Sequence, residues 1–278
     1  MSDFHKHFPA NTKGRDFVVG DLHGSLSILE HMLKELNFNE LTDRLFSVGD
    51  IVDRGPDSLG CLRLLRKPWF HAIMGNHEDM MLRAMSGEEV GLWARNGGEW
   101  YSYYLNTDDR FDVRDLCVQY VQHLPFAATI DMPDGRKFHL VHAEFDDVEP
   151  INDGDLAQRM PELMNEFCFD GPFPLWGRKL FELIFWRNLS AKDIEEHVMQ
   201  MNSFRAMEHF GNLSTIFSGH TPVRKPTQIG PQINLDTFAY RAYDYKEDAA
   251  LTIAEPLTGK FWSSNGGPVV EVNKSVIV

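Results

Sequence analysis

Short apolar runs alternate with helical patterns in the first third of the chain. Three runs have the length and continuous hydrophobicity of strands buried on both faces: residues 15–19, 44–48 and 70–74. Apolar residues recur at helical spacing after each run, in residues 26–36, 58–66 and 78–85. This alternation predicts a parallel sheet whose strands are joined by right-handed crossovers.

The rest of the chain changes from helical patterns to strand patterns. Residues 88–125 are mainly helical in pattern, and a turn at Pro133-Asp134-Gly135 then joins two strand patterns into a hairpin. The strand patterns of this part are residues 127–132, 137–141, 215–217, 232–235, 249–253 and 269–272. We also predict a helix over residues 194–209.

Segments without a regular apolar pattern indicate where the domain begins and where its chain leaves the core. Residues 1–14 are polar, and we expect them to be a flexible tail. Residues 143–186 are rich in acidic residues, Pro and Phe, and we expect an excursion over the surface there. No repeat, low-complexity tract or linker divides the chain, so a single α/β domain over residues 15–278 is expected.

Composition and charge narrow the classes of function. The 278 residues are 43% hydrophobic and 24% charged, which is ordinary for a soluble globular protein. A net charge of −14 argues against nucleic acid or an anionic membrane as partner. The three cysteines (Cys61, Cys117 and Cys168) are scattered, and no apolar run reaches membrane-spanning length. We therefore expect a reducing, cytoplasmic location and no thiolate metal site.

Polar motifs follow the three predicted strands at the points where helices begin. They are residues 20–24 (GDLHG), residues 49–55 (GDIVDRG) and residues 75–78 (GNHE). Two further motifs follow later strands: residues 140–143 (LVHA) and residues 217–222 (FSGHTP). In open α/β sheets the carboxyl ends of strands are where ligands bind, so the five motifs predict one common site.

The residue types in these motifs are metal ligands. Asp21 and His23 are two positions apart at a strand end and can converge on one ion, and both oxygens of Asp50 can bridge two ions. Further nitrogen and oxygen donors are Asn76, His142 and His220. This set, without thiolate, suits manganese, iron or zinc better than copper or calcium.

The neighbouring residues suit phosphate chemistry. A pair of metal ions about 3.5–4 Å apart activates water and holds phosphoryl oxygens. Arg54 can bind phosphate oxygens as a fork, His77 can protonate a leaving alkoxide, and Asp53 can orient His77. Arg187 can add a second cation.

Each of these residues also has an ordinary structural interpretation. Asp53 and Arg54 could form a surface ion pair, His77 could cap a helix, and Asn76 could sit in a turn. Taken singly, those interpretations are favoured. Five motifs in order, each at a strand end, favour a site.

Together the motifs resemble the calcineurin-like metallophosphoesterases, specifically the phosphoprotein phosphatases of the lambda-phosphatase type. The sequence similarity is strong over residues 17–82 and weak at residues 96–98, and it is strong again at residues 140–143 and 219–222. It implies two packed mixed β-sheets flanked by helices in four layers. It also implies a serine/threonine protein phosphatase, with phosphotyrosine as a further substrate.

The resemblance also implies a role for each motif residue. Asp21 and His23 would hold one metal ion, Asp50 would bridge, and the second ion would be held by Asn76, His142 and His220. His77 would be the general acid, supported by Asp53, while Arg54, Arg187 and Asn76 would bind phosphate. Only the resemblance selects His142 over His139, because the apolar pattern there fits a strand buried on both sides.

The reaction implied is in-line attack on phosphorus by a hydroxide that bridges two divalent metal ions, most fittingly manganese. No Cys-x5-Arg loop is present to support a covalent route. A hydrolase of diadenosine tetraphosphate or another phosphoanhydride is the alternative, since such enzymes carry similar motifs. A metal-binding scaffold without turnover is a third hypothesis, which Arg54 and His77 argue against.

Three positions depart from the family pattern. Phe238 stands where family members usually place Gly after Asp-Thr, and Glu144 stands where they often carry Asp or Gly. Residues 143–186 are longer than in the compact phage enzymes, which indicates a remodelled rim of the site.

Overall fold

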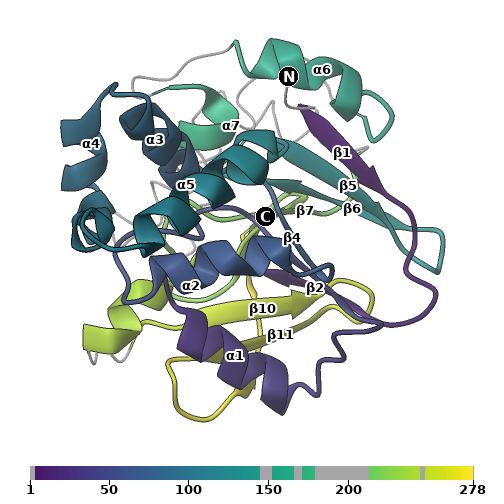
Figure 1. Ribbon diagram of the computed structural model, residues 1–278. Helices are drawn as coiled ribbons and strands as arrows, with labels where there is room; N and C mark the ends of the chain where they lie inside the picture. Colours follow the sequence, from purple (N-terminus) through teal and green to yellow (C-terminus); the bar gives the residue numbers. More distant parts are fainter. Residues whose placement is uncertain (1–3, 145–151, 166–170, 179–212, 245–247, 278) are drawn as a thin grey trace.

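The fold contains two mixed β-sheets that pack face to face (Figure 1). It was obtained as a computed structural model that describes residues 4–144, 152–165, 171–178, 213–244 and 248–277. One sheet has the strand order β12-β11-β10-β2-β3-β4, and the other has the order β1-β5-β6-β7-β9-β8-β13. Helices cover both outer faces, so the predicted α/β fold of two packed mixed sheets, built as one domain, is confirmed.

The predicted strand–helix alternation forms the six-stranded sheet. Strands β2 (Asp16–Val19), β3 (Arg44–Ser47) and β4 (Phe70–Ala72) pair in parallel as expected, and β10 (Leu251–Glu255), β11 (Lys260–Ser264) and β12 (Val270–Val272) add antiparallel strands. Its outer face packs against α1 (Leu26–Glu35), α2 (Ser58–Arg63), α3 (Asn76–Met85) and α5 (Asp109–Gln119). The shorter helices of this layer are η1 (Leu64–Arg66), α4 (Val90–Arg95), η2 (Gly98–Tyr104) and η3 (Val121–His123).

The predicted hairpin begins the seven-stranded sheet. Strands β5 (Ala127–Asp131) and β6 (Lys137–Val141) pair antiparallel, and β7 (Ile216–Ser218) lies parallel to β6. The sheet is completed by β9 (Gln232–Asn234), β8 (Thr227–Ile229) and β13 (Ser275–Ile277), and a turn of 3-10 helix, η5 (Ala239–Asp244), precedes β10. Apolar side chains such as Phe46 of β3 and Phe138 of β6 interlock between the two sheets.

The described part of residues 143–186 differs from the predicted surface excursion. Helix α6 (Leu156–Leu163) buries Leu156, Met160 and Leu163 against the outer face of the seven-stranded sheet and forms the fourth layer. Helix α7 (Phe173–Trp176) is anchored by a hydrogen bond from Ala143 N to Pro174 O of 2.8 Å. The predicted helix over residues 194–209 lies outside the described residues.

The predicted flexible tail at residues 1–14 also differs from the structure. Residues His5–Phe8 form β1, which pairs in parallel with β5 at the edge of the sheet. The Phe8 ring packs on the rings of Phe46 and His71, at centroid distances of 5.1 and 4.8 Å. A half-exposed edge strand carries polar residues, so its sequence pattern is that of a solvated tail.

This packing leads to a prediction on acid stability. Burial, with the charges of Lys6 and Arg44, lowers the pKa of His71 to about 4. An unfolded histidine has a pKa of about 6.5, so neutral His71 contributes stability that is full above pH ~6.5 and is lost as the pH falls towards 4. We expect His71→Phe to flatten the decline of the unfolding free energy over this window by about 3 kcal/mol.

Urea midpoints at several pH values between 4 and 7.5 provide the measurement. The control is Phe138→Leu, which weakens the packing between the sheets at a residue that contacts Phe46 and Phe217, and which should lower stability equally at every pH. An unchanged pH slope in His71→Phe would contradict the assignment.

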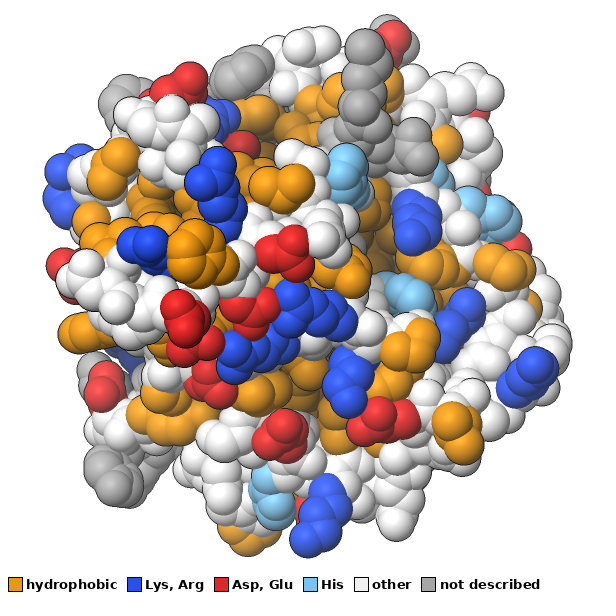
Figure 2. All heavy atoms as spheres, in the orientation of Figure 1, with side chains coloured by type: hydrophobic (Ala, Val, Ile, Leu, Met, Phe, Trp, Pro, Cys, Tyr) orange, Lys and Arg blue, Asp and Glu red, His pale blue; other side chains and the backbone are white. Residues whose placement is uncertain are grey.

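Charged side chains of both signs lie on the outer helices, among apolar and uncharged ones. Acidic and basic side chains are interspersed on the face seen in Figure 2, and Arg63 and Arg66 pair with Asp109, Asp112 and Asp115 across α2, η1 and α5. Within the described ranges, no helix combines the length and the apolar character that a bilayer crossing requires.

Candidate metal centre

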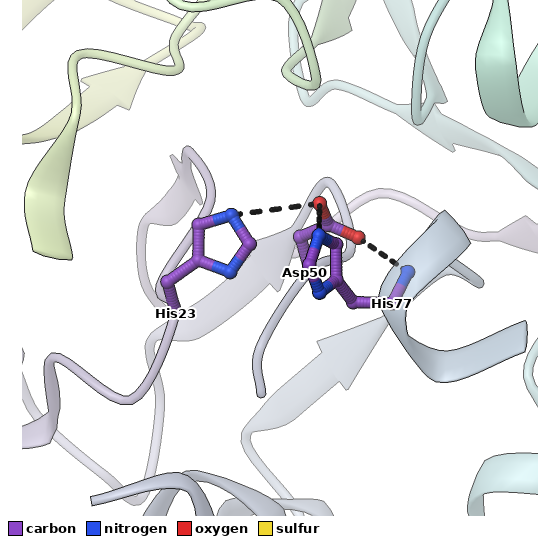
Figure 3. Close-up of side chains that lie close together, drawn as sticks. All are labelled: His23, Asp50 and His77. Carbon is purple, nitrogen blue, oxygen red and sulfur yellow. Dashed lines mark hydrogen bonds and ion pairs between the residues drawn. The ribbon is translucent and has the colours of Figure 1, made fainter. Parts of the chain in front are cut away.

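The polar motifs of both sheets meet at one buried place. Asp21 and His23 follow β2, and Asp50 follows β3. Asn76 and His77 begin α3, while His142 and His220 follow β6 and β7 of the other sheet. At most 4% of any of these side chains is exposed. In Figure 3 the side chains of His23, Asp50 and His77 point toward one another.

Two groups of side chains have donor atoms close enough to share a metal ion. One is His23, Asp50 and His77, and the other is Asp50, His142 and His220. Within each group the donor atoms lie within 4.8 Å of one another. Asp50 belongs to both groups, so its carboxylate lies between two places where a cation fits.

Asn76 and Asp21 lie beside His142 and His220. Asn76 Oδ1 faces His142 Nε2 at 2.8 Å and His220 Nδ1 at 2.9 Å. Asp21 Oδ2 accepts from the backbone N–H of His220 at 3.0 Å. A Cβ atom at Gly219 would lie 1.7 Å from Asp21 Oδ1, so only glycine allows the β7 loop to approach this carboxylate. Every residue that the motifs predicted as a ligand is therefore at this place.

Backbone contacts fix the orientation of two imidazoles. His23 Nδ1 lies 2.8 Å from Val52 O, and His142 Nδ1 lies 2.9 Å from Val48 O. A carbonyl only accepts, so each Nδ1 carries a proton. The Nε2 atom of His23, which accepts from Arg54, keeps a lone pair directed into the site, whereas the Nε2 atom of His142 faces the amide oxygen of Asn76. Donation from Nδ1 to a carbonyl is the arrangement in which protein imidazoles bind metals.

Several buried atoms of the site lack a hydrogen-bond partner. Among the described residues these include Asp21 Oδ1, His77 Nε2 and His220 Nε2. Leaving a buried polar atom unpaired costs about 1–3 kcal/mol, and a cation bound among these donors would remove the cost for a ligand atom. The residues present therefore fit a divalent metal.

Burial and neighbouring charges move the pKa values of the two aspartates in opposite directions. Burial, with the charges of Asp236 and Asp50, raises the pKa of Asp21 well above its usual range. Burial acts in the same direction on Asp50, but the surrounding imidazoles, His142 first among them, outweigh it and hold its pKa well below the usual range. The shared carboxylate is thus charged and ready to bind a cation.

Two imidazoles are held neutral. Burial, followed by the charge of Arg54, lowers the pKa of His23 well below its usual range. Burial, followed by the charge of Arg178, does the same for His220. Neutral imidazoles are the form that binds metal.

The loop that carries Asp50 is strained and is held by a buried glutamate. Asp50, Asp53 and Arg54 have φ angles of 48°, 72° and 67°, in the left-handed region that such residues rarely adopt. Glu78 accepts from the backbone N–H groups of Asp50, Ile51 and Gly75 at 2.8, 2.9 and 3.0 Å. The sequence places Glu78 in a motif but gives no sign of this role.

The predicted pair of His77 and Asp53 is present. His77 Nδ1 lies 2.7 Å from Asp53 Oδ2, while its unpartnered Nε2 lies 3.8 Å from Asp50 Oδ2. Asp53 also accepts from the indole N–H groups of Trp93 and Trp100, which the sequence did not indicate.

The arginines lie at two sides of the centre. Arg54 Nη1 donates to His23 Nε2 at 2.7 Å, and the guanidinium lies 5.2 Å from the ring centroid of Tyr240. Metal binding at His23 thus requires Arg54 to turn away from this nitrogen. Arg187, the predicted second cation, lies outside the described residues, but Arg178 donates from Nη1 to His220 O at 3.2 Å.

His139, which the apolar pattern could not distinguish from His142, is not at the centre. Its Nε2 lies 2.9 Å from Asp153 Oδ1, and its Nδ1 lies 2.9 Å from Thr129 Oγ1. Two positions that depart from the family pattern are also described. Glu144 is buried, and Phe238 has a φ angle of 64° at the position where family members place Gly.

A family model for calcineurin-like phosphoesterases matches residues 17–224. The chain belongs to this family. Metallophosphoesterases of this family use divalent metals, and the groups around Asp50 could bind them in this chain. The match runs from β2 to the loop after β7 and so includes all five polar motifs.

Individual metallophosphoesterases resemble the chain over different spans. Serine/threonine-protein phosphatase 2 of Escherichia coli strain K12 is 38% identical over 142 residues, which are 51% of this chain and 64% of that protein. The symmetrical bis(5'-nucleosyl)-tetraphosphatase of Haemophilus ducreyi is 25% identical over 247 residues, 82% of this chain and 81% of that protein. The matches to the bacterial serine/threonine phosphatases span less than two thirds of their length.

A solved protein phosphatase has a similar fold. A protein serine/threonine phosphatase from Saccharomyces cerevisiae superimposes with a TM-score of 0.56, at 17% identity, over 98% of this chain and 83% of that chain. At this identity the likeness concerns the fold of the metallophosphoesterase.

Proposed function

We propose that the chain is a metal-dependent phosphomonoesterase that removes phosphate from phosphoserine and phosphothreonine in proteins, with phosphotyrosine as a further substrate. The observation that carries this proposal is the position of Asp50, which lies in both ligand groups and beside the His77–Asp53 pair. The similarity to bacterial serine/threonine phosphatases supports the substrate class.

The proposed ligands are those that the sequence predicted. One ion would be held by Asp21, His23 and Asp50, and the other by Asp50, Asn76, His142 and His220. When bound, such ions activate water for attack and neutralise the phosphoryl oxygens. A nitrogen and oxygen donor set without thiolate favours manganese, with iron or zinc as alternatives.

The motif residues around the proposed metal ligands would bind the phosphate and supply a proton. Arg54 would grip two phosphate oxygens as a fork, assisted by Arg187 and by the amide of Asn76. With a proton on each ring nitrogen, His77 would donate the one on Nε2 to the departing oxygen, while Asp53 keeps the proton on Nδ1 and orients the ring through a contact of 2.7 Å. The buried surroundings exclude bulk water from this proton transfer.

A hydrolase of bis(nucleosyl) tetraphosphates or other phosphoanhydrides is the second candidate. This alternative is supported by the match to the tetraphosphatase of Haemophilus ducreyi, which extends over 82% of this chain. A metal-binding scaffold is disfavoured, because Arg54 and the His77–Asp53 pair are not needed to retain metal. A cytoplasmic location and the absence of nucleic-acid and membrane partners remain predictions from composition.

The decisive experiment compares substrates under controlled metal loading. We expect a chelator to abolish hydrolysis of p-nitrophenyl phosphate and manganese to restore it, with a phosphoserine peptide hydrolysed faster than diadenosine tetraphosphate. Full activity in a verified metal-free preparation would overturn the metal dependence. A faster rate on the dinucleotide would select the second candidate.

A further inference from the structure

The Asp53 carboxylate is surrounded by N–H donors. It is 0% exposed and accepts from His77 Nδ1 at 2.7 Å, Trp100 Nε1 at 2.6 Å and Trp93 Nε1 at 2.9 and 3.1 Å. An indole N–H can only donate. Oδ2 is therefore shared by His77 and Trp93, and Oδ1 by Trp100 and Trp93, so both oxygens are fixed in place.

The segment that carries the two tryptophans is shaped to reach Asp53. Trp93 lies on α4 and Trp100 on η2, with ring centroids 6.1 Å apart in an edge-to-face arrangement. A Cβ atom at Gly98 would lie 2.4 Å from the Trp93 ring, and one at Gly97 would lie 2.8 Å from Arg54 N. Two glycines thus allow this segment to approach the Asp53-Arg54 turn.

Packing alone does not explain indoles at these positions. A phenylalanine would bury a comparable apolar ring, whereas a buried indole N–H needs a partner and costs about 1–3 kcal/mol without one. Rotation about the terminal bond of an aspartate is soft, so a carboxylate with a single partner can swing. Three donors around Asp53 remove that freedom.

The fixed carboxylate in turn fixes His77. With Nδ1 held by Asp53, the opposite nitrogen of His77 is directed toward Asp50, 3.8 Å from its Oδ2 atom, and has no hydrogen-bond partner among the described residues. We propose that Trp93 and Trp100 are positioning residues that act through Asp53 to aim His77 at the leaving group. This rests on the proposed function, in which His77 protonates that group.

The test compares two leaving groups in single variants. We expect Trp100→Phe and Trp93→Phe each to lower kcat for a phosphoserine peptide roughly tenfold, as is typical when a supporting hydrogen bond is lost. The rate on p-nitrophenyl phosphate, whose phenolate leaves without a proton, should fall less than about twofold. KM and metal content should stay at wild-type values.

A matched control separates this effect from general weakening of the fold. Trp69 also donates its indole N–H to a carboxylate, Glu40 Oε2, at 2.8 Å, and Phe38 packs on its ring. Trp69→Phe loses the same kind of hydrogen bond outside the site and should leave the ratio of the two rates unchanged. Equal slowing of both substrates in the Trp93 and Trp100 variants would overturn the positioning role.

A double-mutant cycle and a measurement without substrate complete the test. In a His77→Asn background, Trp100→Phe should have no further effect on the peptide rate, and an undiminished tenfold loss would overturn the proposal. By NMR of the metal-free protein, the His77 Nδ1 proton should exchange with water faster in Trp100→Phe than in wild type. If wild type hydrolyses no phosphate ester, the proposed function fails, while the exchange rates still decide whether the tryptophans hold His77.

Discussion

Asp50→Asn is expected to lose bound metal and to lower kcat/KM for p-nitrophenyl phosphate by more than ~10²-fold. Loss of a residue that merely supports a ligand typically costs 10–100-fold, and Asp50 would itself bind both ions. The substitution removes the negative charge that both ligand groups share. Metal content measured by elemental analysis, together with steady-state kinetics, provides the check.

Asp43→Asn is the matched control for this substitution. Asp43 is also a buried aspartate, 5% exposed, but it pairs with Arg15 at 2.7 Å outside the site. It should cost stability while leaving metal content and kcat unchanged. Wild-type metal content and activity in Asp50→Asn would refute the bridging role.

His77→Asn is expected to slow hydrolysis of a phosphoserine peptide by ~10²–10⁴-fold, the usual contribution of a general acid. This corresponds to roughly 3–5 kcal/mol in the activation barrier. Hydrolysis of p-nitrophenyl phosphate should slow much less, because its leaving group needs little protonation. The ratio of the two rates is therefore the measurement.

Metal content in the same variant separates two interpretations of His77. The side chain lies within reach of His23 and Asp50 and could itself be a ligand, whereas the family resemblance makes it the acid. Wild-type metal content would support the acid. Loss of one ion from the variant would indicate that His77 is a metal ligand. Equal slowing of both substrates would indicate that His77 stabilises charge in the transition state and does not transfer a proton.

The sequence indicated that the motif residues lie together because they occupy short contiguous motifs at strand ends. Asp21 and His23, or Asn76 and His77, are neighbours in the chain, so local spacing already limits where their side chains point. The parallel order of β2, β3 and β4 then brings the motifs to one edge. The strand–helix alternation was recognisable because both sheet strands and covering helices bury regular apolar patterns.

The features that the sequence did not predict depend on distant contacts. Trp93 and Trp100 meet Asp53 across 40 and 47 residues, and nothing in the local pattern distinguishes them from core aromatics. Strand β1 has the polar composition of a tail because it lies at a sheet edge. Glu78 acts on backbone N–H groups, and no side-chain pattern records such a partner.

The placement of the centre between two sheets ties its metal affinity to the packing of the whole molecule. Asp50 comes from one sheet, and His142 and His220 come from the other. A bound ion would act as a non-covalent cross-link across this interface, stabilising the native state by about 4 kcal/mol at a free concentration 1,000 times its Kd. Because linkage is reciprocal, a state in which the sheets have separated would bind the ions more weakly by the same coupling free energy. The apolar contacts between the sheets, such as that of Phe46 with Phe138, would therefore help to keep ligands from both sheets in position for the ions.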